Sequence, residues 1–198
     1  DPHAAPADRE AFTDGWFVDA MPDLNQRNPH LARYLIQNTL WWIEYAGLSG
    51  IREDTFGYAD TQFLSDWAKA VLDEYPNFAM VGEEWSINPA VVAHWQRGKQ
   101  NASGHVPHMP SMMDFPVHIA LRNALVQPEG PETGWVGLYE MLANDFVYPD
   151  PDALVVFAEN HDTTRLFAHL DGDLAAWKLG MAYLATVRGT PQFYYGSE

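Results

Sequence analysis

GIRED at residues 50–54, GEEW at residues 82–85 and FAENHD at residues 157–162 decide the fold of this chain. Each stretch places acidic residues at the end of a short apolar run that predicts a strand, and the segments between them have helical spacing. Strands that alternate with helices form parallel βαβ units. In a parallel barrel the carboxyl ends of the strands share one face, where active sites are built, so these acids are predicted to lie on that face.

The rest of the chain alternates predicted strands and helices in the same way. Asn28 and Pro29 predict the start of a helix and Gly47 its end, while Asp60 and Pro76 bound the next one. A doubly wound sheet is the alternative, but no strand is followed by a glycine-rich phosphate loop, which favours the barrel. The expected strands lie near residues 50–55, 78–82, 111–114, 153–158 and 190–195, and the expected helices near 29–46, 60–75, 116–126, 133–143 and 174–188.

The composition excludes several classes of protein. The 198 residues carry 11 basic and 27 acidic side chains, and the net charge of −16 argues against nucleic-acid binding, which needs clustered Lys and Arg. No apolar run reaches the ~18 residues of a membrane span, and no signal peptide is visible. The absence of cysteine excludes disulfides and leaves the compartment open; the sequence gives no oligomeric state. The 8 Trp, 9 Tyr and 10 Phe indicate either a large aromatic core or a saccharide site, where flat rings stack on sugars.

The three acidic stretches contain residues suited to glycoside hydrolysis. Strand alternation puts Arg52 and Asp54 on one side, opposite Glu53, so that the guanidinium keeps Asp54 ionised, as a nucleophile requires. One of Glu83 and Glu84 is expected to be partly desolvated, which suits a general acid. Retaining glycosidases use one charged and one protonated carboxyl ~5–5.5 Å apart. Any one acid at a strand end is more often a solvated cap or a structural ion pair, but three in order, each on a predicted strand end of one βα series, favour catalysis.

These motifs resemble those of the alpha-amylase family of glycoside hydrolases, over essentially the whole chain. GIRED is similar to the family's fourth-strand motif, which implies that Asp54 is the nucleophile and Arg52 its supporting arginine. GEEW is similar to the fifth-strand motif, which implies that Glu83 is the acid/base. FAENHD is similar to the seventh-strand motif, which implies that His161 is a substrate ligand and Asp162 the transition-state stabiliser.

Two further stretches extend the resemblance. TPQFYYGSE at residues 190–198 resembles the eighth-strand segment, and MPDLN at residues 21–25 is similar to a short motif of neopullulanases, cyclomaltodextrinases and related members. The implied fold is α/β, a (β/α)8 TIM barrel present as a C-terminal fragment of about strands four to eight. Residues 1–27 would be the end of an inserted small domain and the lead-in to the barrel, and residues 28–198 the partial catalytic barrel.

The resemblance implies hydrolysis of α-glucosidic bonds in α-glucans by a retaining double displacement. The expected substrates are maltooligosaccharides, cyclodextrins, pullulan or starch. The alternatives are a transglycosylase of the same family and a non-catalytic glucan-binding or inactive fragment. A full barrel takes about 250 residues, so we expect the isolated chain to be unstable or inactive, because its sheet edges and core are uncovered. The expected substrate-binding residues are Arg52, His161, Asn160, Trp85 and Tyr58.

Two glutamates depart from the family pattern. Glu53 and Glu84 stand where small or apolar residues are usual. If both side chains face the helical layer, two acids on adjacent strands need partners or a shared proton. The swapped assignment, with Glu84 rather than Glu83 as the acid, is the alternative at this position.

The remaining candidates concern metals and caps. Gly57 and Tyr58 replace a Lys-His pair that helps to bind sugar and calcium in many amylases. Asp23 is therefore the one calcium candidate, a calcium site needs more oxygen ligands than can be named, and no cofactor is required. Asp114 is expected to cap the following helix, and the histidines lack the spacing of a zinc site.

Overall fold

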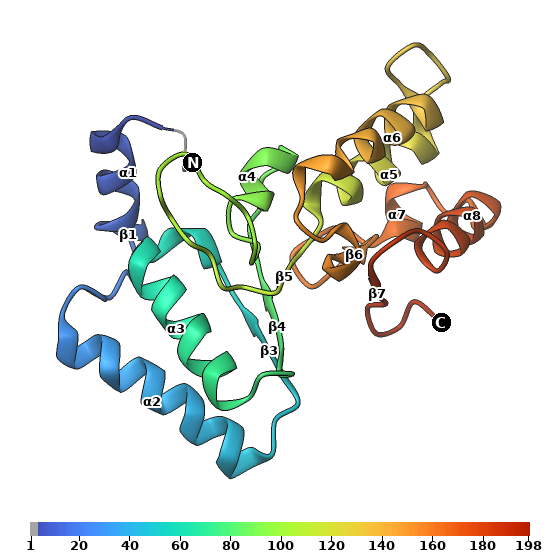
Figure 1. Ribbon diagram of the computed structural model, residues 1–198. Coiled ribbons are helices and arrows are strands. Elements are labelled where there is room, and N and C mark those ends of the chain that lie inside the picture. Colours follow the sequence, from blue (N-terminus) through green and yellow to red (C-terminus); the bar gives the residue numbers. More distant parts are fainter. Residues whose placement is uncertain (1–3) are drawn as a thin grey trace. The chain divides into compact units, whose positions relative to one another are not determined.

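The structure is a computed structural model that describes residues 4–198. The chain divides into two compact units, each of which is described by itself (Figure 1). The first unit contains the described residues up to Glu84 together with His94–Met112. The second unit contains Trp85–Ala93 and Met113–Glu198.

The first unit is built on three parallel strands. They are ordered β3–β4–β5, and residues 50–53 of β3 pair in register with residues 79–82 of β4, so Glu53 lies beside Gly82. The parallel pairing confirms the predicted βαβ arrangement. The elements are α1 (Pro6–Thr13), β1 (Trp16–Val18), β2 (Met21–Pro22), α2 (Pro29–Ala46), β3 (Gly50–Glu53), the 3-10 turn η1 (Phe56–Tyr58), α3 (Thr61–Glu74), β4 (Ala79–Gly82) and β5 (Ser111–Met112).

The two long helices of this unit begin and end where the sequence predicts. The Asn28 side chain accepts a hydrogen bond from the His30 amide, and Gly47 ends α2 with a φ of 63°, a left-handed conformation that glycine adopts readily. The Asp60 side chain accepts from the Phe63 amide at the start of α3. The two helices lie side by side (Figure 1), and the Trp67 indole donates to the Thr39 hydroxyl at 2.9 Å.

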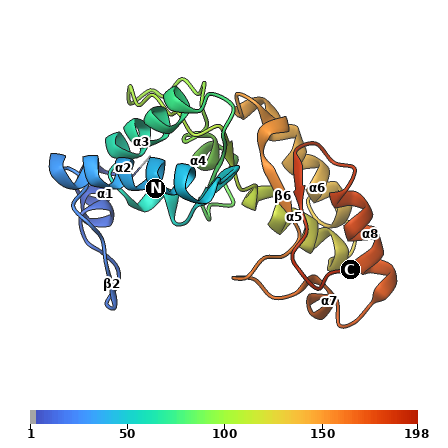
Figure 2. The ribbon, with the colours of Figure 1, turned by 90° about the horizontal axis from the view of Figure 1, so that it is seen from below.

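The second unit is built on the parallel pair β6–β7 and the α-helices that precede or follow it. Its core is formed by buried side chains of α5, α6, β6, α7 and α8. Figure 2 shows α5, α6 and α8 gathered beside this pair. The elements are α4 (Pro89–Ala93), α5 (Phe115–Val126), α6 (Gly134–Leu142), the 3-10 turns η2 (Ala143–Val147) and η3 (Pro151–Ala153), β6 (Val155–Phe157), α7 (Leu166–His169), α8 (Leu174–Leu184) and β7 (Thr190–Gln192).

Several predicted boundaries were too long. The helix predicted to reach residue 188 ends at Leu184, and Gly189, at φ 95°, turns the chain into β7. The last strand ends at Gln192, opposite Phe157 at the end of β6. The strand predicted at residues 111–114 ends at Met112, since Asp114 instead caps α5. The sequence prediction missed the short elements α1, β1, β2, α4 and α7.

The helices differ in how much apolar surface they bury. In α2 only Ile43 is buried, and Trp41 and Tyr45 stack on each other at the surface with ring centres 4.6 Å apart. In α5, by contrast, seven side chains are buried. The described part of the chain has no helix that is both long and apolar enough to span a membrane. The division predicted at residue 27 stays a prediction.

Candidate active site

Arg52 joins two of the predicted catalytic carboxylates. Its Nη1 donates to Asp54 Oδ1 at 2.8 Å and its Nη2 forms an ion pair with Glu83 Oε1. Arg52 and Asp54 therefore lie on the same side of the chain, as strand alternation predicted. Because β3 and β4 pair in register, the arginine of one strand reaches the acid that follows the other. A forked guanidinium is suited to such a bridge, since its donors diverge in one plane.

The two carboxylates differ in their exposure to solvent. The Asp54 side chain is 62% exposed, whereas the Glu83 side chain is 2% exposed. The Thr55 amide donates to Glu83 Oε2 at 3.1 Å, and the Phe56 amide donates to the Glu83 carbonyl. Thr55 has a φ of 47°, which is uncommon for a β-branched residue and lets the turn fold back over Glu83. The burial of Glu83 matches the expectation that one of the two glutamates is desolvated.

The surroundings of Glu53 and Glu84, the two acids that depart from the family pattern, differ. Burial, together with the charge of Asp54 and against that of Arg52, raises the pKa of Glu53 to about 7. Glu84 Oε2 accepts a hydrogen bond from the Trp95 indole at 3.0 Å. The same carboxylate closes over Gly57, where a Cβ atom would collide with it. The sequence predicted partners or a shared proton for these two acids, and the structure gives Glu84 a partner in the Trp95 indole.

Tyr58 lies on the same cavity as Asp54. This cavity of ≈ 280 Å³ is lined by Glu53, Asp54 and Tyr58 and by the hairpin residues Phe17 and Met21, among others. The Tyr58 ring packs against Phe17, with ring centres 4.8 Å apart. Burial raises the pKa of the Tyr58 hydroxyl, as do the nearby charges of Glu84 and Glu83.

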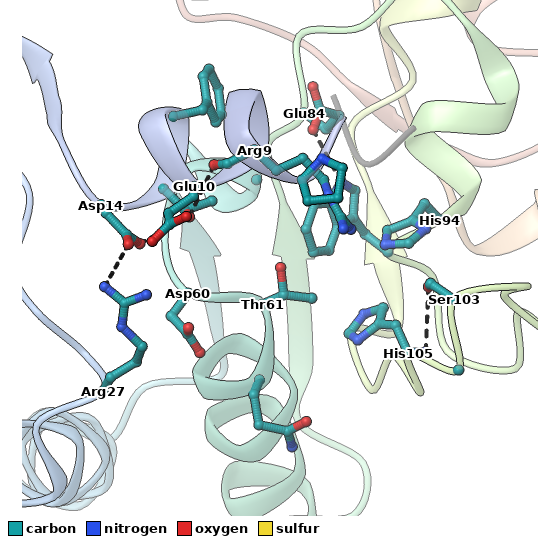
Figure 3. Close-up of a pocket in the computed structure, with 17 residues that line it drawn as sticks. Arg9, Glu10, Asp14, Arg27, Asp60, Thr61, Glu84, His94, Ser103 and His105 are labelled. Atoms are coloured by element: carbon teal, nitrogen blue, oxygen red, sulfur yellow. Dashed lines mark hydrogen bonds and ion pairs between the residues drawn. The ribbon is translucent and has the colours of Figure 1, made fainter. Parts of the chain in front are cut away.

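A larger cavity of the first unit was not predicted. It has a volume of ≈ 520 Å³ and lies between α1, the turn after β3 and the loop around His105 (Figure 3). Glu84 and His94 both line it, and Arg27 forms an ion pair with Asp14 at 2.7 Å at its other end. The sequence carried no signal for this cavity, because its lining comes from six separate segments.

The third predicted carboxylate belongs to the second unit, in the loop after β6. Asn160 Oδ1 accepts from the Asp162 amide at 3.0 Å, and His161 Nε2 lies 3.0 Å from Asp162 Oδ2. The side chains of His161 and Asp162 are open to solvent, while Asn160 is buried with its Nδ2 unpartnered among the described residues. Asn160 thus shapes the turn that presents His161 and Asp162.

Trp85 is the remaining predicted sugar contact. Trp85 is 46% exposed, and its indole packs against Phe115, with ring centres 4.6 Å apart and planes tilted by 31°. Trp85 and Phe115 both belong to the second unit, so this contact lies within it.

The carboxylates of Asp114 and Asp23 both accept hydrogen bonds from neighbouring residues. Asp114 accepts from the Val117 amide and forms an ion pair with Arg188, which confirms the predicted cap. Asp23 Oδ1 accepts from the Leu24 amide and the Gln26 side chain, and its other oxygen is buried with no hydrogen-bond partner in the described part of the chain. Calcium takes six to eight oxygen ligands. Among residues 4–198 no three His, Asp or Glu side chains come together as metal ligands, and the calcium role of Asp23 stays a prediction.

Sequence reasoning missed one set of residues around the Asp162 loop. Glu159 is 4% exposed and accepts hydrogen bonds from Arg165, Leu166 and Ser197. The signal available was the acid itself, since a glutamate in a buried strand end needs partners. Its partners could not be named, because Ser197 lies 38 residues away.

Comparison with known proteins supports the same family as the motifs. The family description "Alpha amylase, catalytic domain" matches residues 7–198. A cyclomaltodextrinase from Bacillus sp is 30% identical over 185 residues, covering 92% of this chain and 30% of the relative. An intracellular maltogenic amylase of Bacillus subtilis (strain 168) is 25% identical over 198 residues, covering 99% of this chain and 31% of that protein.

A solved structure leads to the same conclusion. The alpha-amylase from Geobacillus thermoleovorans, solved in complex with acarbose, is 30% identical with a TM-score of 0.82, covering 98% of this chain and 42% of that one. The chain thus spans about 30% of the length of these curated relatives and forms an α/β part of the family's catalytic barrel. This chain belongs to the alpha-amylase family.

Proposed function

We propose that the protein carrying this chain hydrolyses α-glucosidic bonds in α-glucans by a retaining double displacement. Asp54 would act as the nucleophile, Glu83 as the acid/base and Asp162 as the transition-state stabiliser. The observation that carries the proposal is the bridge of Arg52 between Asp54 and Glu83. One guanidinium fixes both acids of a retaining pair relative to each other, which the two-carboxylate mechanism requires.

The chemistry follows from the surroundings of these two acids. The exposed carboxylate of Asp54 attacks the anomeric carbon while Glu83 gives its proton to the departing glycosidic oxygen. This forms a glycosyl ester on Asp54 and releases the first sugar product. Glu83 then takes a proton from water, whose oxygen attacks the anomeric carbon and frees Asp54. Arg52 stabilises the negative charge that each acid carries in turn.

The remaining assignments extend this proposal. The chain would provide about strands four to eight of the barrel, and Arg52, His161, Asn160, Trp85 and Tyr58 would contact substrate. Maltooligosaccharides, cyclodextrins and pullulan are the expected substrates, supported by the MPDLN stretch and by the cyclomaltodextrinases among the relatives. We expect the 198 residues alone to be inactive, because α2 buries only Ile43 and leaves four large aromatic side chains exposed, at Tyr34, Trp41, Trp42 and Tyr45. A cooperative thermal transition with starch hydrolysis by the isolated chain would contradict this.

Transglycosylation is the second candidate. A cyclomaltodextrin glucanotransferase from Geobacillus stearothermophilus is 31% identical over 181 residues, which cover 24% of that protein. In a transferase, a sugar hydroxyl replaces water in the second step, so the same carboxylates serve both reactions. The two candidates are separated by their products: hydrolysis releases new reducing ends, whereas transfer yields longer chains.

The test is an assay of the complete gene product with maltohexaose, β-cyclodextrin and pullulan. We expect new reducing ends, and proton NMR of the first product should show the α-anomer, because two inversions retain the configuration. First formation of the β-anomer would overturn the double displacement. Binding of these glucans without any turnover would favour the non-catalytic alternative.

A further inference from the structure

The loop that carries His161 and Asp162 is exposed and yet well defined. The Asn160 amide donates to Thr163 Oγ1 at 2.9 Å, and Asn160 Oδ1 accepts from the Asp162 amide. These bonds fix the shape of the turn. Both partners of each bond belong to the loop itself, so they do not fix where the turn sits above the strand.

One carboxylate closes the base of this loop. Glu159 precedes it, and its Oε1 accepts from Arg165 Nη1 at 2.9 Å, at the far end of the loop. Its Oε2 accepts from the Leu166 amide in the first turn of α7, and the Ser197 hydroxyl donates to Oε1 at 2.5 Å. Glu159 therefore ties the residue before the loop, the two residues after it and the segment that follows β7.

Arg165, one of the three donors to Glu159, is itself held in place by aromatic rings. The Arg165 guanidinium lies over the Tyr194 ring, 4.2 Å from its centre, and 5.0 Å from the centre of the Tyr195 ring. Such stacking fixes the guanidinium plane as well as its charge. Burial raises the pKa of Glu159, but the hydrogen bonds from Ser197, Leu166 and Arg165 outweigh it and lower the pKa overall. The group is thus an ionised anchor with three donors.

We propose that Glu159 is the positioning residue of Asp162: through Arg165, Leu166 and Ser197 it sets the height and orientation of the loop that presents this acid. The proposal rests on the proposed function, because Asp162 matters only where a glycosyl transition state forms. A positioning error of about 1 Å can cost about 10²-fold in rate. A purely structural anchor would instead stabilise the second unit without any special effect on turnover.

The first test compares Glu159→Gln with Glu140→Gln in the complete gene product. Glu140 is an exposed glutamate of α6 and serves as the matched control. In Glu159→Gln an amide nitrogen faces donors, so kcat is expected to fall about 10–100-fold with little change in KM. The control should keep wild-type values. Wild-type kcat in Glu159→Gln would overturn the proposal.

A double-mutant cycle separates positioning from stability. If Glu159 acts through Asp162, the double variant Glu159→Gln/Asp162→Asn turns over no more slowly than Asp162→Asn alone. Additive losses would show a merely structural role and overturn the proposal. Arg165→Lys, which keeps the charge but loses the fork and the stacking, should give a smaller loss and so guards against a Glu159 variant that fails to fold.

Hydrogen exchange tests the anchor without any activity. In Glu159→Gln, amides of residues 160–166 are expected to exchange faster, whereas those of α5 keep wild-type protection. If the wild-type protein hydrolyses no α-glucan, the proposed function fails, while the exchange result still decides whether Glu159 fixes the loop. Unchanged exchange in residues 160–166 would overturn the proposal whatever the activity.

Discussion

The strand ends of the two units hold their acids in different ways. In the first unit, Arg52 of β3 belongs to the same five-residue stretch as Asp54 and bridges it to Glu83, which follows β4. After β6, the exposed Asp162 depends on Glu159, whose partners extend to Ser197. The first arrangement is contained in the motifs themselves, whereas the second is completed by chain far from the motif. A motif can therefore contain an acid and still omit the residues that position it.

The three acids proposed as catalytic give the largest expected effect. Glu83→Gln should lower kcat by about 10²–10⁴-fold, the usual range for loss of a general acid, and Asp54→Asn by at least as much. Asp162→Asn tests the same point in the second unit. Each is measured by initial rates on maltohexaose, with circular dichroism to check folding.

Glu84→Gln is the matched control for the first unit. Its partner Trp95 donates to either side chain, so the loss should be mild. A loss equal to that of Glu83→Gln would instead make Glu84 the acid.

The buried ion pair of the second unit gives the next effect. Asp114 is fully buried and pairs with Arg188, which also pairs with Asp145. Arg188→Met leaves this buried carboxylate without a counter-charge, so the free energy of unfolding should fall by about 3–5 kcal/mol in urea denaturation. Lys69→Met, which removes an exposed pair with Asp73, should cost only about 0.3–0.5 kcal/mol. Similar losses of unfolding free energy in the two variants would contradict the burial of Asp114.

Arg52 and Arg165 allow a direct comparison of how the two units hold their acids. Lysine at residue 52 can reach one carboxylate but cannot bridge two, and a hydrogen bond to a charged group is worth about 1.5–3 kcal/mol. Arg52→Lys should therefore lower kcat/KM by about 10–100-fold, and Arg165→Lys by less. The reverse order would mean that the loop after β6, not the bridge, limits the site.

The smallest expected effect is a pH dependence from Glu53. Its pKa is raised to about 7 by burial and by the charge of Asp54, against Arg52, so the folded state binds a proton that the unfolded chain releases near 4.5. Stability is therefore lost as the pH rises from about 4.5 to about 7. Glu53→Gln, which resembles the protonated acid, should raise the melting temperature at pH 8 and change it little at pH 5. Exposed Glu132→Gln should not show this difference between the two pH values.

Much of the local structure could be predicted because its causes lie within a few residues. Asn28, Gly47 and Asp60 bound helices through hydrogen bonds or backbone conformations set by immediate neighbours. The parallel pairing of the strands followed from their alternation with helices. The short elements α1, β1 and β2 were missed, because their residues are mostly exposed and leave no clear apolar period.

The sequence by itself determined the family, the order of the three acids and the side of the strand shared by Arg52 and Asp54. Only the tertiary structure decided that Arg52 also reaches Glu83, that Glu53 is buried enough to hold a proton near pH 7, and that Glu159 anchors the Asp162 loop. The physical reason is the distance along the chain over which each interaction acts. Strand alternation and helix capping act over two to four residues, whereas burial and ion pairing depend on segments that only packing brings together.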